Sequence, residues 1–404
     1  MINLNDKSVS VSMPVYQGIL IIYACGRYMI ITIIADVYGK QNNGTAITAQ
    51  RLIESLTDRG YEVRVVSPYS CEKEGYYTVP KRNFYCFNNY VSKNGVELAK
   101  PDKEVLTKAI TGSDLVHIMM PFKLGRAALK IAKKLHVPCT AAFHCQPENF
   151  SSHIFLKDVK LVNDYLYNRF RRVLYKHVKH IHCPSEYIAS ELTAHKYKSA
   201  LHVISNGVAP CYKKTDSVRP SEYEGKILIL FTGRFAGEKR HDLLVKGVAA
   251  SRYRDKIQII CAGKGPKQEK VMALAEKLKV NPPVIRFFTP DELNEVINYC
   301  DLYVHPADVE IEAIAALEAI TCGLVPVIND SPRSATRFFA LDERSLFDGT
   351  PRSLAAKIDY WIEHPEEKAE ASLKYIEYAQ KFKLDNSIDM MEIMFKEAVA
   401  DDAK

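Results

Sequence analysis

The fold is decided by the stretch Val304-His-Pro-Ala-Asp-Val-Glu310-Ile-Glu-Ala-Ile-Ala-Ala-Leu-Glu318-Ala-Ile-Thr-Cys-Gly323-Leu-Val-Pro-Val327. A short apolar strand leads into it, an alanine-rich helix carries the second glutamate, and Gly323 ends that helix before the next buried strand. This order is typical of a strand–loop–helix–strand unit in a parallel sheet. It predicts Glu310 on the loop at the top of the sheet and Glu318 about two turns into the helix. Both carboxylates can then face one cleft, where they can accept hydrogen bonds from sugar hydroxyls.

Composition indicates a soluble globular protein that is long enough for two domains of ordinary size. The chain has 404 residues, of which 47% are hydrophobic and 25% charged, and its net charge of +7 favours acidic partners only weakly. Its ten cysteines show no Cys-x-x-Cys or other paired metal-ligand spacing. We therefore expect reduced thiols in the cytoplasm, no metal site and no nucleic-acid partner.

Residues 1–28 do not follow the pattern of the remaining chain. Their apolar run at 15–24 is too short to span a bilayer, and its flank lacks the positive charge of a signal peptide. Met29, in contrast, opens a run that is typical of a buried first strand. We interpret residues 1–28 as an N-terminal extension, with a membrane-contacting segment as the alternative.

After Met29, predicted strands and helices alternate in two series. The first series, residues 29–207, has strands at 30–35, 62–67, 115–119, 138–143, 180–183 and 201–204, and helices at 45–59, 125–135 and 157–180. The polar segment 208–225 is interpreted as a linker. The second series, residues 226–385, has strands at 227–232, 257–262, 284–287, 302–304 and 325–328, and helices at 241–251, 268–278, 290–300 and 312–321. Residues 386–404 form a C-terminal helix or tail. The prediction is an α/β fold of two Rossmann-like, doubly wound parallel-sheet domains that face each other across a cleft.

One glycine loop of the second series carries two cations. In Phe231-Thr-Gly-Arg-Phe-Ala-Gly-Glu-Lys239, Gly233 lets the backbone turn tightly after a strand, and Arg234 and Lys239 lie near one point. A diphosphate needs such cationic partners. The alternative is a solvated basic loop without a ligand.

Two further glycine turns also join a strand to a helix. Ala262-Gly-Lys-Gly-Pro266 places Gly263 and Gly265 at a turn that a nucleotide can approach closely, although ordinary turns of this kind also use glycine. In the first series, Gly44 and Thr45 open a helix, and backbone amides at a helix N-terminus suit an anion. A plain turn is the alternative in both places.

The strand at 138–143 of the first series ends in Phe143-His-Cys-Gln-Pro-Glu-Asn149. His144 is therefore expected to point into the cleft, where it can contact a sugar or a reacting hydroxyl. Glu148 and Asn149 are candidates for contact with an acceptor. The alternative for His144 is a structural histidine with satisfied hydrogen bonds.

Taken together, these motifs resemble those of retaining glycosyltransferases with the GT-B fold, family 4, in which a Glu-x7-Glu element, a Gly-Arg-x4-Lys loop and a Gly-x-Gly-Pro turn recur. The resemblance covers roughly residues 29–385 and implies transfer of a hexose from a nucleoside diphosphate sugar to a hydroxyl. It implies that Arg234 and Lys239 stabilise the leaving diphosphate, while Gly233, Gly263 and Gly265 allow backbone contact with the nucleotide. Glu310 would hold donor-sugar hydroxyls, Glu318 would accept from the ribose, and His144 would orient the sugar. Gly44 and Thr45 would close over the donor phosphate. No metal or other cofactor is implied.

Two positions depart from the family pattern: Glu312 stands where an aromatic residue is usual, and Ala313 where glycine is usual. A third carboxylate and a tighter backbone are expected to affect which sugar fits. Neither change removes Glu310 or Glu318.

The acceptor and the localisation follow from a basic stretch after residue 156. Residues 157–182 hold seven Lys and Arg against two Asp, with apolar residues at helical spacing, and a basic amphipathic helix can lie on an anionic bilayer. His144-Cys-Gln-Pro-Glu-Asn149 followed by this stretch also resembles bacterial diacylglycerol glucosyltransferases. It therefore implies UDP-glucose as donor, diacylglycerol as acceptor, and a cytoplasmic protein at the inner face of the membrane. A core-facing helix, a soluble or polysaccharide acceptor, and a non-catalytic protein that binds sugar nucleotides remain the alternatives.

Overall fold

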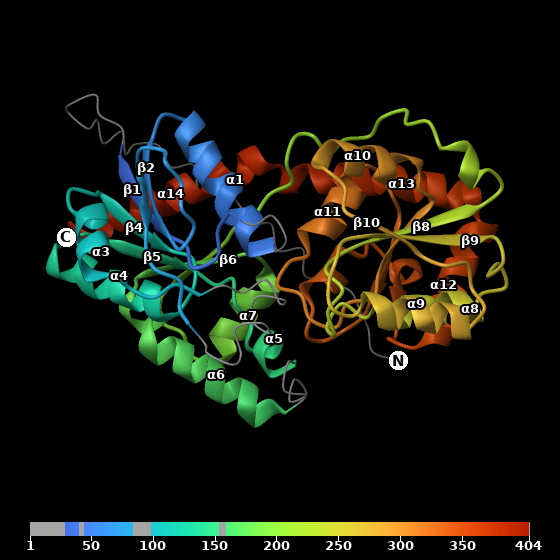
Figure 1. Ribbon diagram of the computed structural model, residues 1–404, viewed down its shortest axis with the longest axis horizontal. Helices are drawn as coiled ribbons and strands as arrows, with labels where there is room; N and C mark the ends of the chain where they lie inside the picture. Colours follow the sequence, from blue (N-terminus) through green and yellow to red (C-terminus); the bar gives the residue numbers. More distant parts are fainter. Residues whose placement is uncertain (1–28, 40–43, 84–97, 153–158, 404) are drawn as a thin grey trace, which may run out of the picture.

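The structure is a computed structural model, and it describes residues 29–39, 44–83, 98–152 and 159–403. The expected extension 1–28, residues 40–43 just before Gly44, and Lys157 of the basic stretch lie outside the described residues. Figure 1 shows two α/β domains side by side, with the chain crossing between them twice.

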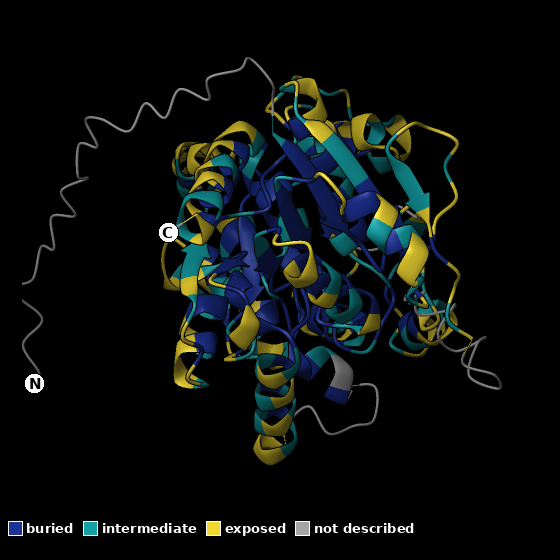
Figure 2. Ribbon diagram, turned by 90° about the vertical axis from the view of Figure 1, so that its left-hand side faces the viewer, coloured by how far each residue is buried: buried dark blue, intermediate teal, exposed yellow. Residues whose placement is uncertain are grey.

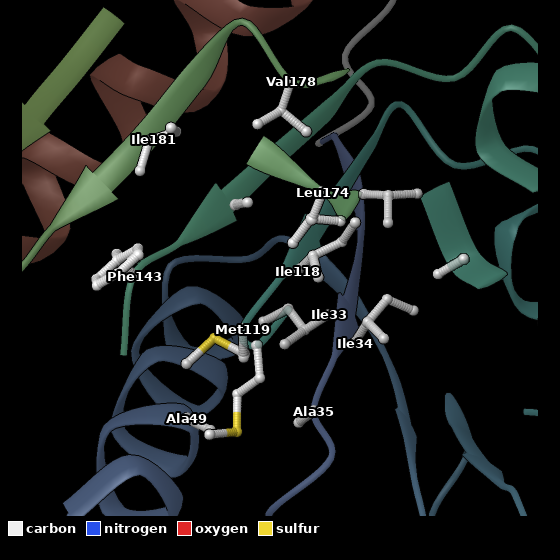
Figure 3. Packing of buried hydrophobic residues seen from close by; sticks show 14 of the residues in the cluster. Ile33, Ile34, Ala35, Ala49, Ile118, Met119, Phe143, Leu174, Val178 and Ile181 are labelled. Atoms are coloured by element: carbon white, nitrogen blue, oxygen red, sulfur yellow. The ribbon is translucent and has the colours of Figure 1, made fainter. Parts of the chain in front are cut away.

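A parallel sheet of seven strands forms the centre of the first domain, in the order β3-β2-β1-β4-β5-β6-β7. Its strand β1 has the sequence Ile-Ile-Thr-Ile-Ile and is buried along its whole length, as expected for a strand that helices cover on both faces. Figure 3 shows part of this core, where Ile33 and Ile34 of β1 lie near Ile118 of β4. The strands are β1 Ile30–Ile34, β2 Glu62–Ser67, β3 Tyr76–Thr78, β4 Leu115–Ile118, β5 Cys139–Ala142, β6 His180–Cys183 and β7 Ala200–Val203.

The helices of the first domain cover both faces of this sheet, and their outer surfaces are exposed (Figure 2). They are α1 Gly44–Asp58, α3 Lys103–Ile110, α4 Lys123–Lys134, α5 Pro147–Ser152, α6 Lys160–Val173 and α7 Glu186–Ala194. The elements β3, α3 and α5 were not predicted. Helix α3 is capped by Asp102, whose side chain accepts hydrogen bonds from the backbone amides of residues 104 and 105.

The prediction of one helix over 157–180 is wrong. Helix α6 ends at Val173, a short 3₁₀ turn follows at Tyr175–His177, and β6 begins at His180. Leu174 leaves the helical region because it and Tyr175 are drawn into the core, where the Tyr175 hydroxyl donates to the carbonyl of Ala142. The stretch contains neither glycine nor proline, so the sequence carried no helix-stop signal.

The second domain repeats this architecture with a parallel sheet of six strands in the order β10-β9-β8-β11-β12-β13. The strands are β8 Ile227–Thr232, β9 Ile257–Ala262, β10 Val284–Arg286, β11 Leu302–His305, β12 Pro326–Asn329 and β13 Leu346–Phe347. The helices are α8 His241–Ala250, α9 Gln268–Lys277, α10 Pro290–Tyr299, α11 Ile314–Thr321, α12 Pro351–Glu363 and α13 Pro365–Ala379. Two parallel, doubly wound domains confirm the predicted fold class.

The strand order reverses once in each sheet, between β1 and β4 and between β8 and β11. In doubly wound sheets ligands bind outside the carboxyl ends of the strands at such a switch point. In the second domain, this is the edge at which β8 leads into the loop of Arg234 and β11 leads into the loop of Glu310. The fold thus brings together motifs that lie more than 70 residues apart in the chain.

The two crossings between the domains are bound to each other. Val208 donates its amide to the carbonyl of Phe382, and Leu384 returns a hydrogen bond to the carbonyl of Val208. Gly207 has a φ of +78°, and a Cβ there would lie 2.7 Å from Cα of Leu384, so only glycine fits. Helix α14, Leu384–Asp402, then packs Met391, Phe395 and their neighbours into the core of the first domain. The expected helix or tail is therefore a helix up to Asp402, and its buried face packs against the first domain.

Candidate functional site

The glycine loops after β8 and β9 interlock. Gly263 has a φ of +155°, and a Cβ there would lie 2.2 Å from the carbonyl oxygen of Gly233. A Cβ on Gly265 would come within 2.7 Å of the backbone nitrogen and oxygen of Phe235. The amide of Phe235 also donates to the carbonyl of Lys264. The two predicted turns therefore form one backbone surface, which explains Gly263 and Gly265 without reference to any ligand.

Beside this surface lies a charged cluster of Lys239, Glu310 and His305. The Lys239 ammonium pairs directly with the Glu310 carboxylate, and Nε2 of His305 lies 3.2 Å from the same oxygen. Burial alone would raise the pKa of Glu310, but Lys239 and His305 outweigh it and lower this pKa to about 2. Glu310 is therefore an ionised carboxylate at neutral pH, held at the carboxyl edge of the sheet.

Arg234, the second predicted cation, is held by another carboxylate. Its Nη2 donates to Oε1 of Glu238 at 3.2 Å, and its side chain is 21% exposed. Lys239 is similarly exposed at 22%. Both cations can therefore be reached by an anion, while acidic partners keep them in place without one.

Glu318 contacts the first domain rather than Glu310. Arg51 of α1 donates from Nη2 to Oε1 of Glu318 at 2.7 Å, and both side chains are nearly buried. Burial raises the pKa of Glu318, and the Arg51 guanidinium opposes that rise. Helix α11 begins at Ile314 instead of residue 312, so Glu318 lies little more than one turn into the helix and not two.

Glu312 is bound at the contact between the two domains, so it is not presented as a third open carboxylate, and its effect on sugar fit stays a prediction. Its side chain is 1% exposed, and its carboxylate accepts hydrogen bonds from the backbone amide of Asn206 at 3.0 and 3.2 Å and from Nδ2 of Asn206 at 2.5 Å. Ser185 also donates to the carbonyl of Ile311 at 2.6 Å. The segment 310–312 is thus a junction between the two domains.

Ala313 has a φ of +67° at the start of α11, in the left-handed region that favours glycine. This conformation costs an alanine about 1 kcal/mol. We therefore expect Ala313→Gly to raise the free energy of unfolding by up to about 1 kcal/mol, measured by denaturant midpoint. An Ala315→Gly change inside the same helix is the matched control and should lower it. Equal destabilisation by both changes would contradict the strain at Ala313.

On the first-domain side, His144 follows β5 and is buried. Burial, together with neighbouring His182 and His117, lowers the pKa of His144 well below its usual value, so its ring is neutral at neutral pH. Gln146, two residues on, donates to the carbonyl of Arg333 at 3.1 Å, and the amide of Glu310 points to the same oxygen at 3.4 Å. The loop of His144 and the loop of Glu310 therefore meet at one carbonyl.

The remaining predicted residues are placed less centrally. Glu148 is buried, its pKa is raised by burial, and it accepts a hydrogen bond from Tyr167 of α6 at 3.3 Å. Asn149 is half-buried in α5 beside it. Gly44 and Thr45 start α1, but a Cβ at Gly44 would meet nothing within 4 Å, and the residues just before it are not described. Their predicted role with phosphate stays a prediction.

Sequence reasoning missed Arg51, His305 and Gln146. His305 stands within the quoted stretch, directly at the end of β11, and its position at a strand end was the available signal. Gln146 lies two residues beyond the predicted His144. Arg51 carried no signal, because its partner Glu318 lies 267 residues away in the other domain.

Among the described residues, one cluster of potential metal ligands lies in the first domain, on β6, β7 and α14. The ligand atoms of His180, His202 and Glu397 all lie within 4.8 Å of one another. The two imidazoles already face each other at 3.0 Å, which a simple hydrogen bond explains. The cluster lies at the start of β6 and on β7, away from the carboxyl edge that holds Glu310.

The basic stretch predicted to contact a membrane has two different faces. Tyr167, Phe170 and Leu174 pack into the core, whereas Leu161, Tyr165, Arg169, Arg172 and Lys176 are exposed. A surface hollow of about 780 Å³ beside them is lined by basic residues and two tyrosines, with no acidic side chain: Arg171, Arg172, Tyr175, Lys176, Val178, Lys179, Lys196, Tyr197, Lys198 and Ser199. No helix in the described parts of the chain has the length and apolar character needed to cross a membrane.

The fold and the site define a two-domain glycosyltransferase of the GT-B type. Residues 42–210 match the family model described as Glycosyltransferase Family 4, and residues 213–382 match that described as Glycosyl transferases group 1. The chain therefore belongs to the family 4 glycosyltransferases, as the sequence motifs predicted.

Its similarity to individual relatives is more distant. It is 22% identical to alpha-monoglucosyldiacylglycerol synthase of Streptococcus pneumoniae over 75% of this chain and 72% of that protein. It is 26% identical to a GDP-mannose-dependent alpha-mannosyltransferase of Corynebacterium glutamicum, with the same coverage. Among solved structures, HepE of Anabaena in complex with UDP and glucose covers 92% of this chain, and all of HepE is matched, with a TM-score of 0.72 at 14% identity. This structural likeness concerns the fold.

Proposed function

We propose that the protein transfers glucose from UDP-glucose to the hydroxyl of a membrane lipid, diacylglycerol, with retention of anomeric configuration. The observation that carries the proposal is the ionised Glu310, held by Lys239 at the carboxyl edge of the second sheet and joined through the carbonyl of Arg333 to the loop of His144. It supports a donor sugar lying between the two domains. The membership of the family supports a nucleoside diphosphate as the carrier of that sugar.

In this proposal, each charged group has one task. Arg234 and Lys239 stabilise the negative charge that develops on the leaving diphosphate, so no metal ion is assigned a role. Glu310 accepts hydrogen bonds from donor-sugar hydroxyls because it is ionised at neutral pH. Neutral His144 can donate or accept a hydrogen bond near the anomeric carbon without adding charge there.

The lipid acceptor is supported by the exposed face of α6. Leu161 is 80% and Tyr165 54% exposed, and Arg169 and Arg172 continue the same helical face. Arg172 also lines the basic hollow, together with Lys176 of the turn that follows the helix. Apolar residues that precede cations in this way suit the boundary between acyl chains and anionic headgroups. The relative from Streptococcus pneumoniae is named for a glycolipid product, which agrees with this acceptor class. The protein would then act at the inner face of the cell membrane.

A panel of donors and acceptors tests the proposal. Purified protein is given UDP-glucose, UDP-galactose or GDP-mannose with anionic vesicles that contain diacylglycerol or a sterol, or with soluble glucose oligomers, and released nucleotide and product anomer are measured. We expect turnover of UDP-glucose that depends on diacylglycerol vesicles and yields the α-anomer. Turnover of GDP-mannose instead would mean that the donor is GDP-mannose and not UDP-glucose. Turnover with the glucose oligomers alone would mean that the acceptor is a soluble saccharide and not a lipid. Binding of nucleotide sugar without any turnover would indicate a non-catalytic protein.

A further inference from the structure

We propose that Arg51 is a positioning residue that orients Glu318 for the donor ribose and links nucleotide binding to the hinge between the domains. The inference rests on the proposed function, because it assumes that a nucleotide lies against Glu318. It concerns a residue of the first domain that acts on the nucleotide site of the second.

The first step of the argument is the geometry of the guanidinium. Arg51 donates from Nη2 to Glu318 at 2.7 Å and from Nη1 to the carbonyl of Gly207 at 3.1 Å. Gly207 lies in the first crossing between the domains, which is itself bound to the second crossing at Leu384. One planar side chain thus contacts helix α11 and the hinge at the same time, and lysine could not replace it because an ammonium lacks this fixed fork.

The second step is charge. Glu318 is nearly buried, with 9% of its side chain exposed, and burial raises its pKa while Arg51 lowers it. A carboxylate offers about four lone-pair sites, and the Arg51 contact takes one of them on Oε1. Within the described residues the Arg51 contact is made to Oε1, so an ionised Glu318 can accept from ribose hydroxyls at Oε2. Arg51 therefore favours the ionised form of Glu318, which is the form that a ribose needs, and restricts its orientation.

The third step is the coupling to the hinge. A ribose that binds Glu318 fixes the orientation of its carboxylate, which also accepts a hydrogen bond from Arg51. Arg51 in turn donates to the carbonyl of Gly207 in the hinge. Binding free energy at the nucleotide is thereby shared with the contact between the domains, which is what thermodynamic linkage requires of two coupled sites. The same pair would make nucleotide affinity depend on the ribose hydroxyls.

The experiment measures nucleotide binding by calorimetry, which needs neither acceptor nor turnover. UDP and GDP are titrated into the wild type, Arg51→Gln, Glu318→Gln and the double variant, each also with the matching nucleotide that lacks both ribose hydroxyls. We expect Arg51→Gln to weaken binding about tenfold and to reduce the preference for ribose. In the Glu318→Gln background, Arg51→Gln should add little, because the effect passes through Glu318. As the pH falls, both proteins should bind nucleotide more weakly. Arg51→Gln should lose affinity at a higher pH than the wild type, because Glu318 protonates more readily without the guanidinium.

The matched control is Arg59→Gln, in the turn that directly follows the same helix. Arg59 also pairs with carboxylates, those of Asp389 and Glu392 on α14, and donates to the carbonyl of Asp385 at 3.2 Å. Among the described residues it contacts neither Glu318 nor the carbonyl of Gly207. Its loss should leave nucleotide binding unchanged even where the melting temperature falls. Equal weakening by both variants, or full additivity with Glu318→Gln, would overturn the inference while leaving the proposed function intact. A wild type that binds neither nucleotide would overturn both.

Discussion

Replacing Lys239 by alanine is expected to lower kcat of sugar transfer about 10²- to 10³-fold, with a smaller rise in KM for the donor. The ammonium lies at the switch point of the second sheet and is ion-paired with Glu310, so it can meet charge on the leaving diphosphate as that charge develops. Its removal also takes away one of the two partners, Lys239 and His305, that hold the pKa of Glu310 at about 2, so this pKa is expected to rise. The variant therefore loses the Lys239 ammonium and has a smaller fraction of Glu310 in the ionised form. Initial rates at saturating donor separate the kcat effect from binding.

Two further variants make this prediction specific. Glu310→Gln keeps the shape of the side chain but removes its charge, and we expect a loss in the same range. Lys246→Ala is the control, because Lys246 also pairs with a carboxylate of its own domain, Asp242, but on the exposed surface of α8. It should retain wild-type kcat. Near-wild-type turnover in Lys239→Ala and Glu310→Gln, with the fold intact by circular dichroism, would rule out this site.

The fold could be predicted because local patterns and long-range packing agree in it. Strands such as β1 are continuous β-branched runs, and only a parallel sheet covered on both faces buries such a run completely. The stretch from Val304 to Val327 is confirmed as strand, loop, helix and strand, namely β11, α11 and β12. The error over 157–180 arose where core packing ended a helix that the local sequence would have continued.

The candidate site could be predicted only as far as each motif lies on one loop. Lys239 and Glu310 were expected at one edge of the sheet because both follow strands beside the switch point. The direction of a side chain within such a loop was not predictable. Glu310 and Glu312 lie two residues apart, yet one pairs with Lys239 and the other with Asn206 of the opposite domain. Contacts between the domains depend on how the domains are placed relative to each other, and the periodicity of the sequence does not predict that placement.

Glu312 carries the second large expected effect, a change of stability with pH. Burial raises the pKa of Glu312 from 4.5 to about 7, although hydrogen bonds from Asn206 and Ser205 oppose the rise. In the pH range between these two values, the folded protein therefore binds a proton that the unfolded chain has released. Stability from this group is fully present below about pH 4.5 and is lost as the pH rises through about 7. The loss between about pH 5.5 and about pH 8 amounts to about 2 kcal/mol, from 1.4 kcal/mol per pKa unit.

The Glu312→Gln variant isolates this contribution, since its amide resembles the protonated carboxyl and does not titrate. We expect the wild type and the variant to have similar denaturant midpoints at about pH 5.5, and the wild type to fall below the variant at about pH 8. Asp36, whose pKa burial also raises to about 7, changes stability equally in both proteins, so the difference between them excludes it. Glu377→Gln, at an exposed carboxyl of α13, is the control and should follow the wild type at every pH. Parallel pH profiles of wild type and Glu312→Gln would mean that Glu312 stays ionised when folded. The three hydrogen bonds from Asn206 would then outweigh burial, and the junction between the domains would be held by a charge rather than by a neutral carboxyl group.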